Sequence, residues 1–177
     1  MALNKPERGH VPISVDKKHF YIHPYYTRNN TRHDIGLIHL PRKVLFSEHI
    51  QPVKLPTACK STLHNIDAFA MGHGITSDDA STCNELIFSF LKTLSPADCR
   101  DTFPVSSKHT TIICAQNAVK GQSVCRDDSG GPLVSRANGT LIGISSGGVL
   151  QMDVTKACRK DSQMYTLISA GLIITPV

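Results

Sequence analysis

The sequence lacks the marks of several protein classes. It has no run of about 18 apolar residues, the length that a transmembrane helix needs, so we expect no membrane partner. None of the six cysteines belongs to a Cys-x-x-Cys pair, and the nine histidines form no His-Glu-x-x-His pattern. Tryptophan, internal repeats and low-complexity segments are absent as well. We therefore predict neither a metal site nor a cofactor.

The charged residues argue against a nucleic-acid partner. The 19 Lys and Arg residues outnumber the 14 Asp and Glu residues, giving a formal net charge of +5, but they are scattered along the chain. Proteins that bind nucleic acids usually gather their basic residues into one patch or stripe. The excess positive charge therefore indicates an ordinary solvated surface.

The cysteines indicate an extracellular protein. Their even number and wide spacing favour disulfides, which persist in oxidising compartments. Glycosylation sequons at Asn29 and Asn138 agree with this location. The polar N-terminus MALNKPERGH does not fit a signal peptide. We expect a secreted protein whose N-terminal part is absent from this chain.

Short apolar runs separated by turn residues predict an all-β fold, as a barrel or a sandwich. The expected strands are 20–22, 35–40, 66–73, 86–94, 110–115, 131–135, 140–145 and 164–168. One short helix is expected at 96–102, with Ser95 as its N-cap and Pro96 in its first position. The segment HIQPVKLPTACKST has two prolines and little periodicity, which predicts a connector with a boundary near Pro56.

The stretch CRDDSGGPL, residues 125–133, carries the most informative motif. Two glycines follow Ser129, so no side-chain bulk lies beside its hydroxyl, and glycine permits backbone angles that other residues resist. Such a loop can present the Ser129 hydroxyl in a cleft and aim backbone N–H groups at a developing oxyanion. On the pattern alone, a tight glycine turn without catalytic function is an equal alternative.

The same stretch resembles the nucleophile motif GDSGGP of the chymotrypsin/trypsin family of serine endopeptidases. HDIGLIHL resembles the strand that bears the family's catalytic aspartate, and AFAMGHG, LIGISSGG and MYTLIS resemble three further strands. The resemblance covers almost the whole chain from about residue 12. It implies a chymotrypsin-like double β-barrel with an incomplete first barrel: residues 1–56 are its remnant, and 57–177 form the second barrel.

The resemblance also implies roles for individual residues. Ser129 is the nucleophile, and Asp34 is the carboxylate that orients the base. The backbone N–H groups of Asp127 and Ser129 form the oxyanion hole, and Asp128 pairs with the N-terminal amine that activation cleavage creates. The substrate pocket and groove are formed by Ser123, Ser146, Gly148 and Gln163.

The family's disulfides have counterparts here. Cys99 and Cys114 match one family pair, and Cys125 and Cys158 match another. The two remaining cysteines, at 59 and 83, have no clear counterparts. The implied partners are protein or peptide substrates and protease inhibitors.

One catalytic group is missing. The family's histidine precedes the aspartate by roughly 45 residues, but only 33 residues precede Asp34, and no Ala-Ala-His-Cys signature occurs. His33 is adjacent to Asp34, and neighbouring side chains on a strand point to opposite faces. We therefore expect that His33 does not replace the missing histidine. His23 and His39 are interpreted as surface or packing residues. Asp127 also replaces a glycine of the family pattern and brings a carboxylate near the oxyanion hole.

Two functions therefore remain. The first is a serine endopeptidase that acts through an acyl-enzyme, with this chain inactive because its histidine is absent. The alternative is a non-catalytic relative that keeps the fold as a binding or regulatory protein.

Overall fold

The computed structural model describes residues 11–27, 33–57, 63–75, 85–102, 112–119, 124–150 and 164–169. For residues 147–150 and 164–169 it describes the backbone alone. Within these ranges no helix has the length and apolar character that crossing a membrane requires.

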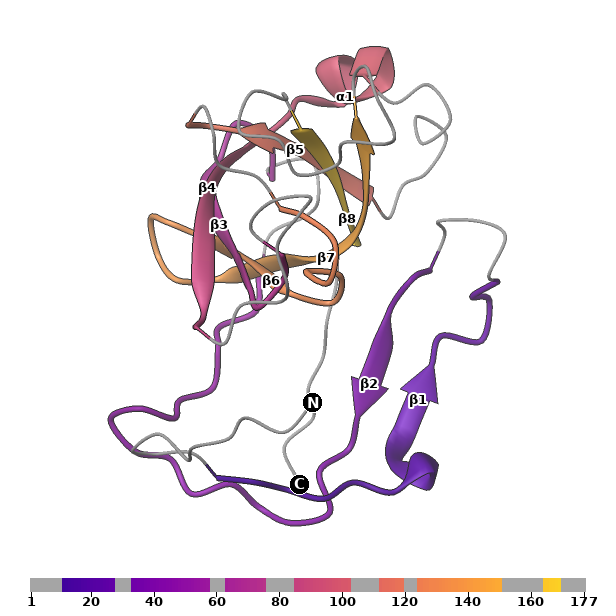
Figure 1. The fold of residues 1–177 in the computed structure, drawn as a ribbon, viewed down its shortest axis with the longest axis vertical. Helices are drawn as coiled ribbons and strands as arrows, with labels where there is room; N and C mark the ends of the chain where they lie inside the picture. Colours follow the sequence, from indigo (N-terminus) through magenta and orange to yellow (C-terminus); the bar gives the residue numbers. More distant parts are fainter. Residues whose placement is uncertain are drawn as a thin grey trace.

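The strands form two separate sheets (Figure 1). A 3-10 turn, η1 (Lys17–His19), leads into a two-stranded antiparallel sheet of β1 (Phe20–Ile22) and β2 (Gly36–Ile38). The other sheet is a closed antiparallel barrel in the order β3-β4-β5-β8-β7-β6. Its strands are β3 (Asp67–Gly72), β4 (Ile87–Thr93), β5 (Ile112–Asn117), β6 (Pro132–Ser135), β7 (Leu141–Leu150) and β8 (Met164–Ser169). All eight predicted strands are thus confirmed, and the barrel and incomplete first sheet agree with the predicted fold class.

The barrel encloses the hydrophobic core. Along its strands, side chains alternate between the interior and the outer surface, as the pleat of a β-strand requires. Ala68, Leu91 and Leu133 come from three neighbouring strands and are almost fully buried. The core cluster comprises Leu63, Ala68, Ala70, Leu91, Ile113, Ala115, Val124, Leu133 and Ile142.

The first sheet has little core of its own. Its two strands pair over only three residues each, and Phe20 and Ile22 are mostly exposed. Backbone hydrogen bonds extend the ladder at both ends, from His39 N–H to His19 O and from His23 N–H to Ile35 O. No side chain of either strand is buried.

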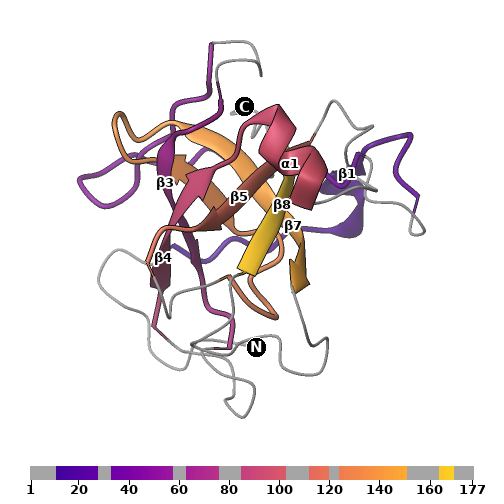
Figure 2. The same ribbon diagram turned by 90° about the horizontal axis from the view of Figure 1, so that it is seen from above.

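The helix α1 (Pro96–Thr102) begins where the sequence predicts. The Ser95 hydroxyl accepts the Asp98 backbone N–H at 3.1 Å and donates to the Asp98 carboxylate at 2.6 Å. This reciprocal cap satisfies an N–H group that has no partner within the helix. A Cys99–Cys114 disulfide ties the helix to β5, which confirms the first predicted pair. Figure 2 shows α1 lying across the end of the barrel.

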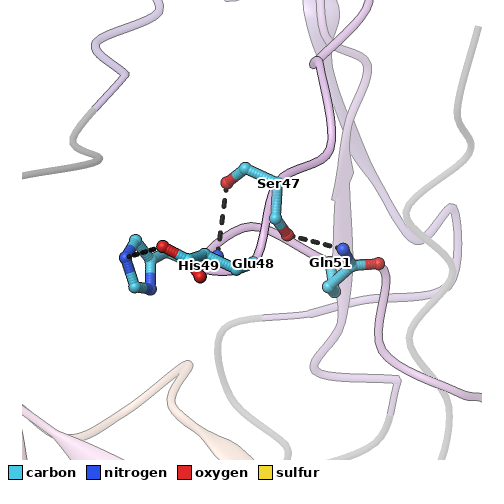
Figure 3. A network of polar contacts seen from close by, with 4 residues as sticks. All are labelled: Ser47, Glu48, His49 and Gln51. Carbon is cyan, nitrogen blue, oxygen red and sulfur yellow. Dashed lines mark hydrogen bonds and ion pairs between the residues drawn. The ribbon is translucent and has the colours of Figure 1, made fainter.

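The connector between the sheets contains one compact turn. Ser47 and Ile50 exchange backbone hydrogen bonds, the Ser47 hydroxyl accepts the His49 N–H, and the Gln51 amide donates to the Ser47 carbonyl (Figure 3). Beyond the turn, Lys54 forms a parallel bridge with Thr140 of the barrel. The domain boundary near residue 56 stays a prediction.

Candidate active site

The loop that carries the serine motif is organised around Asp128. One oxygen of its carboxylate accepts the Cys125 N–H at 2.8 Å, and the other accepts the Gly74 N–H at 2.9 Å. Two backbone bonds tighten the turn further: Asp128 N–H donates to Cys125 O, and Gly131 N–H donates to Asp128 O. The resemblance assigns Asp128 to pair with an N-terminal amine. In the structure two amide donors satisfy the carboxylate instead.

Three glycines make room for this arrangement. A Cβ atom on Gly72 would lie 2.0 Å from an Asp128 carboxylate oxygen, and one on Gly74 would lie 2.5 Å from it. A Cβ on Gly131 would lie 2.5 Å from the Met71 carbonyl oxygen. The Gly-His-Gly and Ser-Gly-Gly sequences are therefore two halves of one packing arrangement. Sequence reasoning assigned both by resemblance but missed their contact through Asp128.

Ser129 lies at the exposed tip of the loop. Asp127 has φ 68° and Gly130 has φ 85°, so the residues that flank Asp128 and Ser129 both adopt the left-handed conformation. The Gly130 N–H anchors the turn to Ser145 O of β7 at 2.7 Å. Within the described part of the chain, neither the hydroxyl nor the N–H of Ser129 has a hydrogen-bond partner. Ser129 as a whole is exposed.

Asp34 is bonded to the barrel through a side chain of β7. It lies in the segment just before β2, and its carboxylate accepts the hydroxyl of Ser146 at 2.6 Å, across 112 residues of sequence. Both side chains are half-buried. The consecutive β7 residues Ser145 and Ser146 thus bind the serine loop and Asp34 respectively. Asp34 and the residue that follows Ser129 are thus bonded to adjacent residues of β7.

The histidines near Asp34 contact one another instead of completing a triad. The His23 and His33 rings are stacked 4.5 Å apart, with Tyr25 against both. His19 and His39 form a second stack at 5.9 Å. The expectation that His33 lies on a strand is wrong: it sits in a turn with φ 55°, before β2 begins. Among the described residues, no histidine bonds to Asp34 or Ser129.

The remaining predicted residues are only partly described. Ser123, Gln163 and Cys158 lie outside the described residues. Gly148 lies on β7, opposite Thr166 of β8. Cys125 is disulfide-bonded, and its partner lies outside the described residues. In the described ranges, no group of three or more His, Cys, Asp or Glu side chains could hold a metal ion.

Comparisons with known proteins identify related sequences. A family model described as Trypsin matches residues 2–168. Trypsin-1 of Salmo salar is 34% identical over 128 residues, 71% of this chain and 50% of the relative. Chymotrypsin of Phaedon cochleariae is 29% identical over 173 residues, 97% of this chain and 59% of the relative.

Two further matches extend the comparison. The venom serine protease Bi-VSP of Bombus ignitus is 28% identical over 140 residues, 76% of this chain and 39% of the relative. The solved structure of neuropsin, a serine protease of mouse brain, superposes with a TM-score of 0.70 at 27% identity, covering 89% of this chain and 66% of that one. The chain thus spans about half the length of the curated relatives it matches.

Proposed function

Because the chain belongs to the trypsin family of serine proteases, we propose that it carries the nucleophile half of an endopeptidase site and that the chain by itself does not hydrolyse peptides. Ser129 is the nucleophile, and Asp34 is the carboxylate that orients a histidine base. The observation that carries this assignment is the pair of neighbouring bonds on β7, Gly130 N–H to Ser145 O and Ser146 hydroxyl to Asp34. The two bonds support the assignment because they attach Asp34 and the residue that follows Ser129 to adjacent residues of β7.

The chemistry follows from these positions. With a base present, the Ser129 hydroxyl attacks the substrate carbonyl, and its proton passes to the imidazole and then to the leaving amine. The N–H groups of Asp127 and Ser129 stabilise the oxyanion of the tetrahedral intermediate. Water then hydrolyses the acyl-enzyme. The unpartnered Ser129 N–H and the left-handed Asp127 backbone support this role of the loop.

The missing step is proton removal. A serine hydroxyl is a weak nucleophile unless an adjacent base activates it. His23 and His33 stack on each other, and His19 stacks on His39, so these rings contact one another. Loss of one triad member typically lowers the rate by several orders of magnitude. We therefore expect no measurable turnover from this chain.

The proposed substrates are proteins and peptides, met outside the cell. Ser123, Ser146, Gly148 and Gln163 are proposed to line the pocket and groove. Ser123 is neutral at the position where trypsin-like pockets hold an acid, so a substrate Arg or Lys would be buried there without a counter-charge, which is costly. We expect cleavage after uncharged residues once a histidine base is supplied. We also expect protease inhibitors to bind in the same groove.

A second candidate function is a non-catalytic binding or regulatory protein. Asp127 favours it, because its exposed carboxylate stands beside the proposed oxyanion hole and its φ of 68° is one that glycine adopts more easily. Negative charge at that position opposes the charge that develops during acyl transfer. In this function the proposed groove residues Ser146 and Gly148 would bind an extended peptide as an added strand.

Labelling and activity assays distinguish these functions. The purified chain is incubated with a fluorophosphonate probe and a peptide library, beside a Ser129→Ala control. A second arm uses a chimera in which a first-barrel segment with Ala-Ala-His-Cys precedes residue 12. We expect no Ser129-dependent labelling or turnover from the chain, and both from the chimera.

Each result has a consequence. Efficient Ser129-dependent turnover by the chain itself contradicts the proposed inactivity. A folded chimera that binds peptides but is not labelled by the fluorophosphonate probe supports the non-catalytic function. A chimera that cleaves mainly after Arg or Lys contradicts the pocket assignment.

A further inference from the structure

We propose that Asn138, in the turn that joins β6 to β7, is a site of N-linked glycosylation. The residues Asn138, Gly139 and Thr140 form one of two Asn-x-Thr sequons in the chain. The other sequon, at Asn29, lies outside the described residues. Sequons in surface loops of secreted proteins are the acceptors of N-linked glycans. Because such triplets also occur by chance, the assignment depends on how the turn presents Asn138.

The turn consists of residues 136–139 and is closed by backbone hydrogen bonds. The Gly139 N–H donates to the Ser135 carbonyl at 3.0 Å, and the Ser135 N–H donates to the Thr140 carbonyl at 2.8 Å. Gly139 has φ 69°, a left-handed conformation that glycine adopts readily. All four residues of the turn are exposed. The turn therefore presents Asn138 to solvent on a hydrogen-bonded backbone.

The Asn138 side chain uses its oxygen within the turn and leaves its nitrogen unbonded. Its Oδ1 accepts the Thr140 N–H at 3.1 Å. The oxygen must face this group, because the amide nitrogen is itself a donor. Nδ2, the atom that receives the sugar, has no hydrogen-bond partner among the described residues. A glycan on Nδ2 therefore keeps the hydrogen bond by which the side chain stabilises the turn.

The transfer needs a donor oligosaccharide that is linked to a lipid through a diphosphate. Nδ2 of Asn138 forms a bond to the anomeric carbon of the first sugar, and the bond from that carbon to the diphosphate oxygen breaks. One Nδ2 proton is lost, and the lipid diphosphate is the leaving group. No bond of Oδ1 changes, so the product fits the folded turn as the free side chain does.

The glycan stands at the opposite end of β6 from the serine loop. β6 begins at Pro132, just after the loop that contains Ser129, and ends at Ser135, just before the turn. The two ends of an extended strand of this length are about 10 Å apart and point in opposite directions. A glycan at Asn138 therefore leaves the side of the barrel that carries Ser129 open to substrates.

The environment of Thr140 indicates when the glycan is added. The sequon is recognised through its hydroxyl residue as well as its asparagine, but Thr140 is only 9% exposed in the folded protein. Thr140 forms a bridge with Lys54 of the connector, and the next residue, Leu141, donates its N–H to the Lys54 carbonyl at 2.8 Å. Folding thus buries a residue that must be recognised. The sugar is therefore added before β6 and β7 pair.

Expression in eukaryotic cells, with a cleavable secretion signal before the full chain, tests the site. Asn29→Gln is the background, because it removes the second sequon. Asn138→Gln, Thr140→Val and Thr140→Ser are added to it one at a time. Molecules that have lost the signal, and so have entered the secretory pathway, are compared on gels with and without an amidase that releases N-linked glycans. We expect one glycan on the background and on Thr140→Ser, and none on the other two variants.

The variants at position 140 are matched. Valine keeps the branched shape of threonine and removes the hydroxyl, whereas serine keeps the hydroxyl and completes the sequon. An unmodified background overturns the proposal, as does a glycan that persists in Asn138→Gln. The assay measures glycan attachment and not proteolysis, so its result is independent of the proposed function.

Transfer in vitro tests the order of folding and modification. The folded chain with Asn29→Gln and an unfolded peptide of residues 132–143 are each incubated with an oligosaccharyltransferase and a lipid-linked oligosaccharide. We expect the peptide to be modified at least about tenfold faster, because the folded chain must first open locally to expose Thr140. Equal rates would mean that burial of Thr140 does not protect the sequon, and addition before folding would then be wrong.

Discussion

The closed barrel and the two-stranded sheet of β1 and β2 come from one chain but are held together by different means. In the barrel every strand pairs with two neighbours, and the side chains between them fill a common core. In the two-stranded sheet each strand has one partner and no buried side chain. An isolated two-stranded sheet is marginally stable in water at best. The position of this first sheet therefore depends on its attachments to the barrel.

The proposed catalytic residues are divided between these regions. Ser129 belongs to a loop that the barrel fixes through Asp128 and Ser145, whereas Asp34 lies just before β2 and is bonded to Ser146 of the barrel. The loop of Ser129 is thus bonded to the barrel at several points. For Asp34 the described residues provide a side-chain hydrogen bond from Ser146.

Hydrogen exchange should show the largest difference. The amides of His39 in the first sheet and Ser145 in the barrel both donate bonds of 2.9 Å. The first opens by local separation of two strands, and the second only by opening of the barrel. We expect the His39 amide to exchange at least about a thousandfold faster, a gap of ~4 kcal/mol. Similar rates, measured by mass spectrometry or NMR, would mean that the two regions open together.

Truncation of one apolar side chain should give the next largest difference between the two regions, in the free energy of unfolding. Leu133 is 0% exposed in the barrel, and Ile22 is 70% exposed in the first sheet. Leu133→Ala should lower the free energy of unfolding by about 3 kcal/mol, because it removes buried methyl groups and leaves a cavity. Ile22→Ala should change it by less than about 0.5 kcal/mol. Urea denaturation measures both, and equal losses would show that the first sheet has a core.

Substitution of glycine by alanine should give a smaller difference in stability between the barrel and the first sheet. A Cβ on Gly131 meets the Met71 carbonyl at 2.5 Å, whereas one on Gly36 meets the Tyr21 carbonyl at 3.3 Å. Gly131→Ala is expected to cost about 2 kcal/mol, since the backbone must shift. Gly36→Ala is expected to stay within about 0.5 kcal/mol. A melting temperature unaffected by Gly131→Ala would mean that the loop can move away freely.

The smallest expected effect concerns the attachment between the regions. Ser146→Ala removes the hydrogen bond to Asp34, and we expect exchange at His23 and His39 to rise about fivefold, or ~1 kcal/mol. The barrel amides should not change. Ser47→Ala, in the connector turn, removes a comparable hydroxyl and serves as the control (Figure 3). If both variants act alike, the Ser146–Asp34 bond does not hold the first sheet.

The sequence predicted the individual strands and the helix better than the contacts between them. Alternating apolar residues on 66–73 and 86–94 identify strands because the pleat alone sets that period. The helix start follows from Ser95, whose cap acts within one turn. By contrast, the Ser146–Asp34 bond spans 112 residues, and no local pattern reveals it. Nor does any pattern indicate the left-handed turn at His33, which changes the direction of its ring.

The candidate site was predictable to the same degree. The motif at Ser129 is local, so its loop could be assigned from residues 125–133 alone. The Asp128 contacts with Gly74 and Cys125 combine a local bond with one across 54 residues, and only the local part could be anticipated.

The fit of Gly72 and Gly74 against Asp128 has a consequence for how this chain can diverge. His73 lies between the two glycines and is exposed, so its side chain meets no such constraint. Neither glycine has that freedom, because any side chain there would occupy the place of the Asp128 carboxylate. Replacing Asp128 alone would leave the Gly74 and Cys125 amides without their acceptor. The three residues therefore constrain one another, because a change at any one of them would need compensating changes at the others.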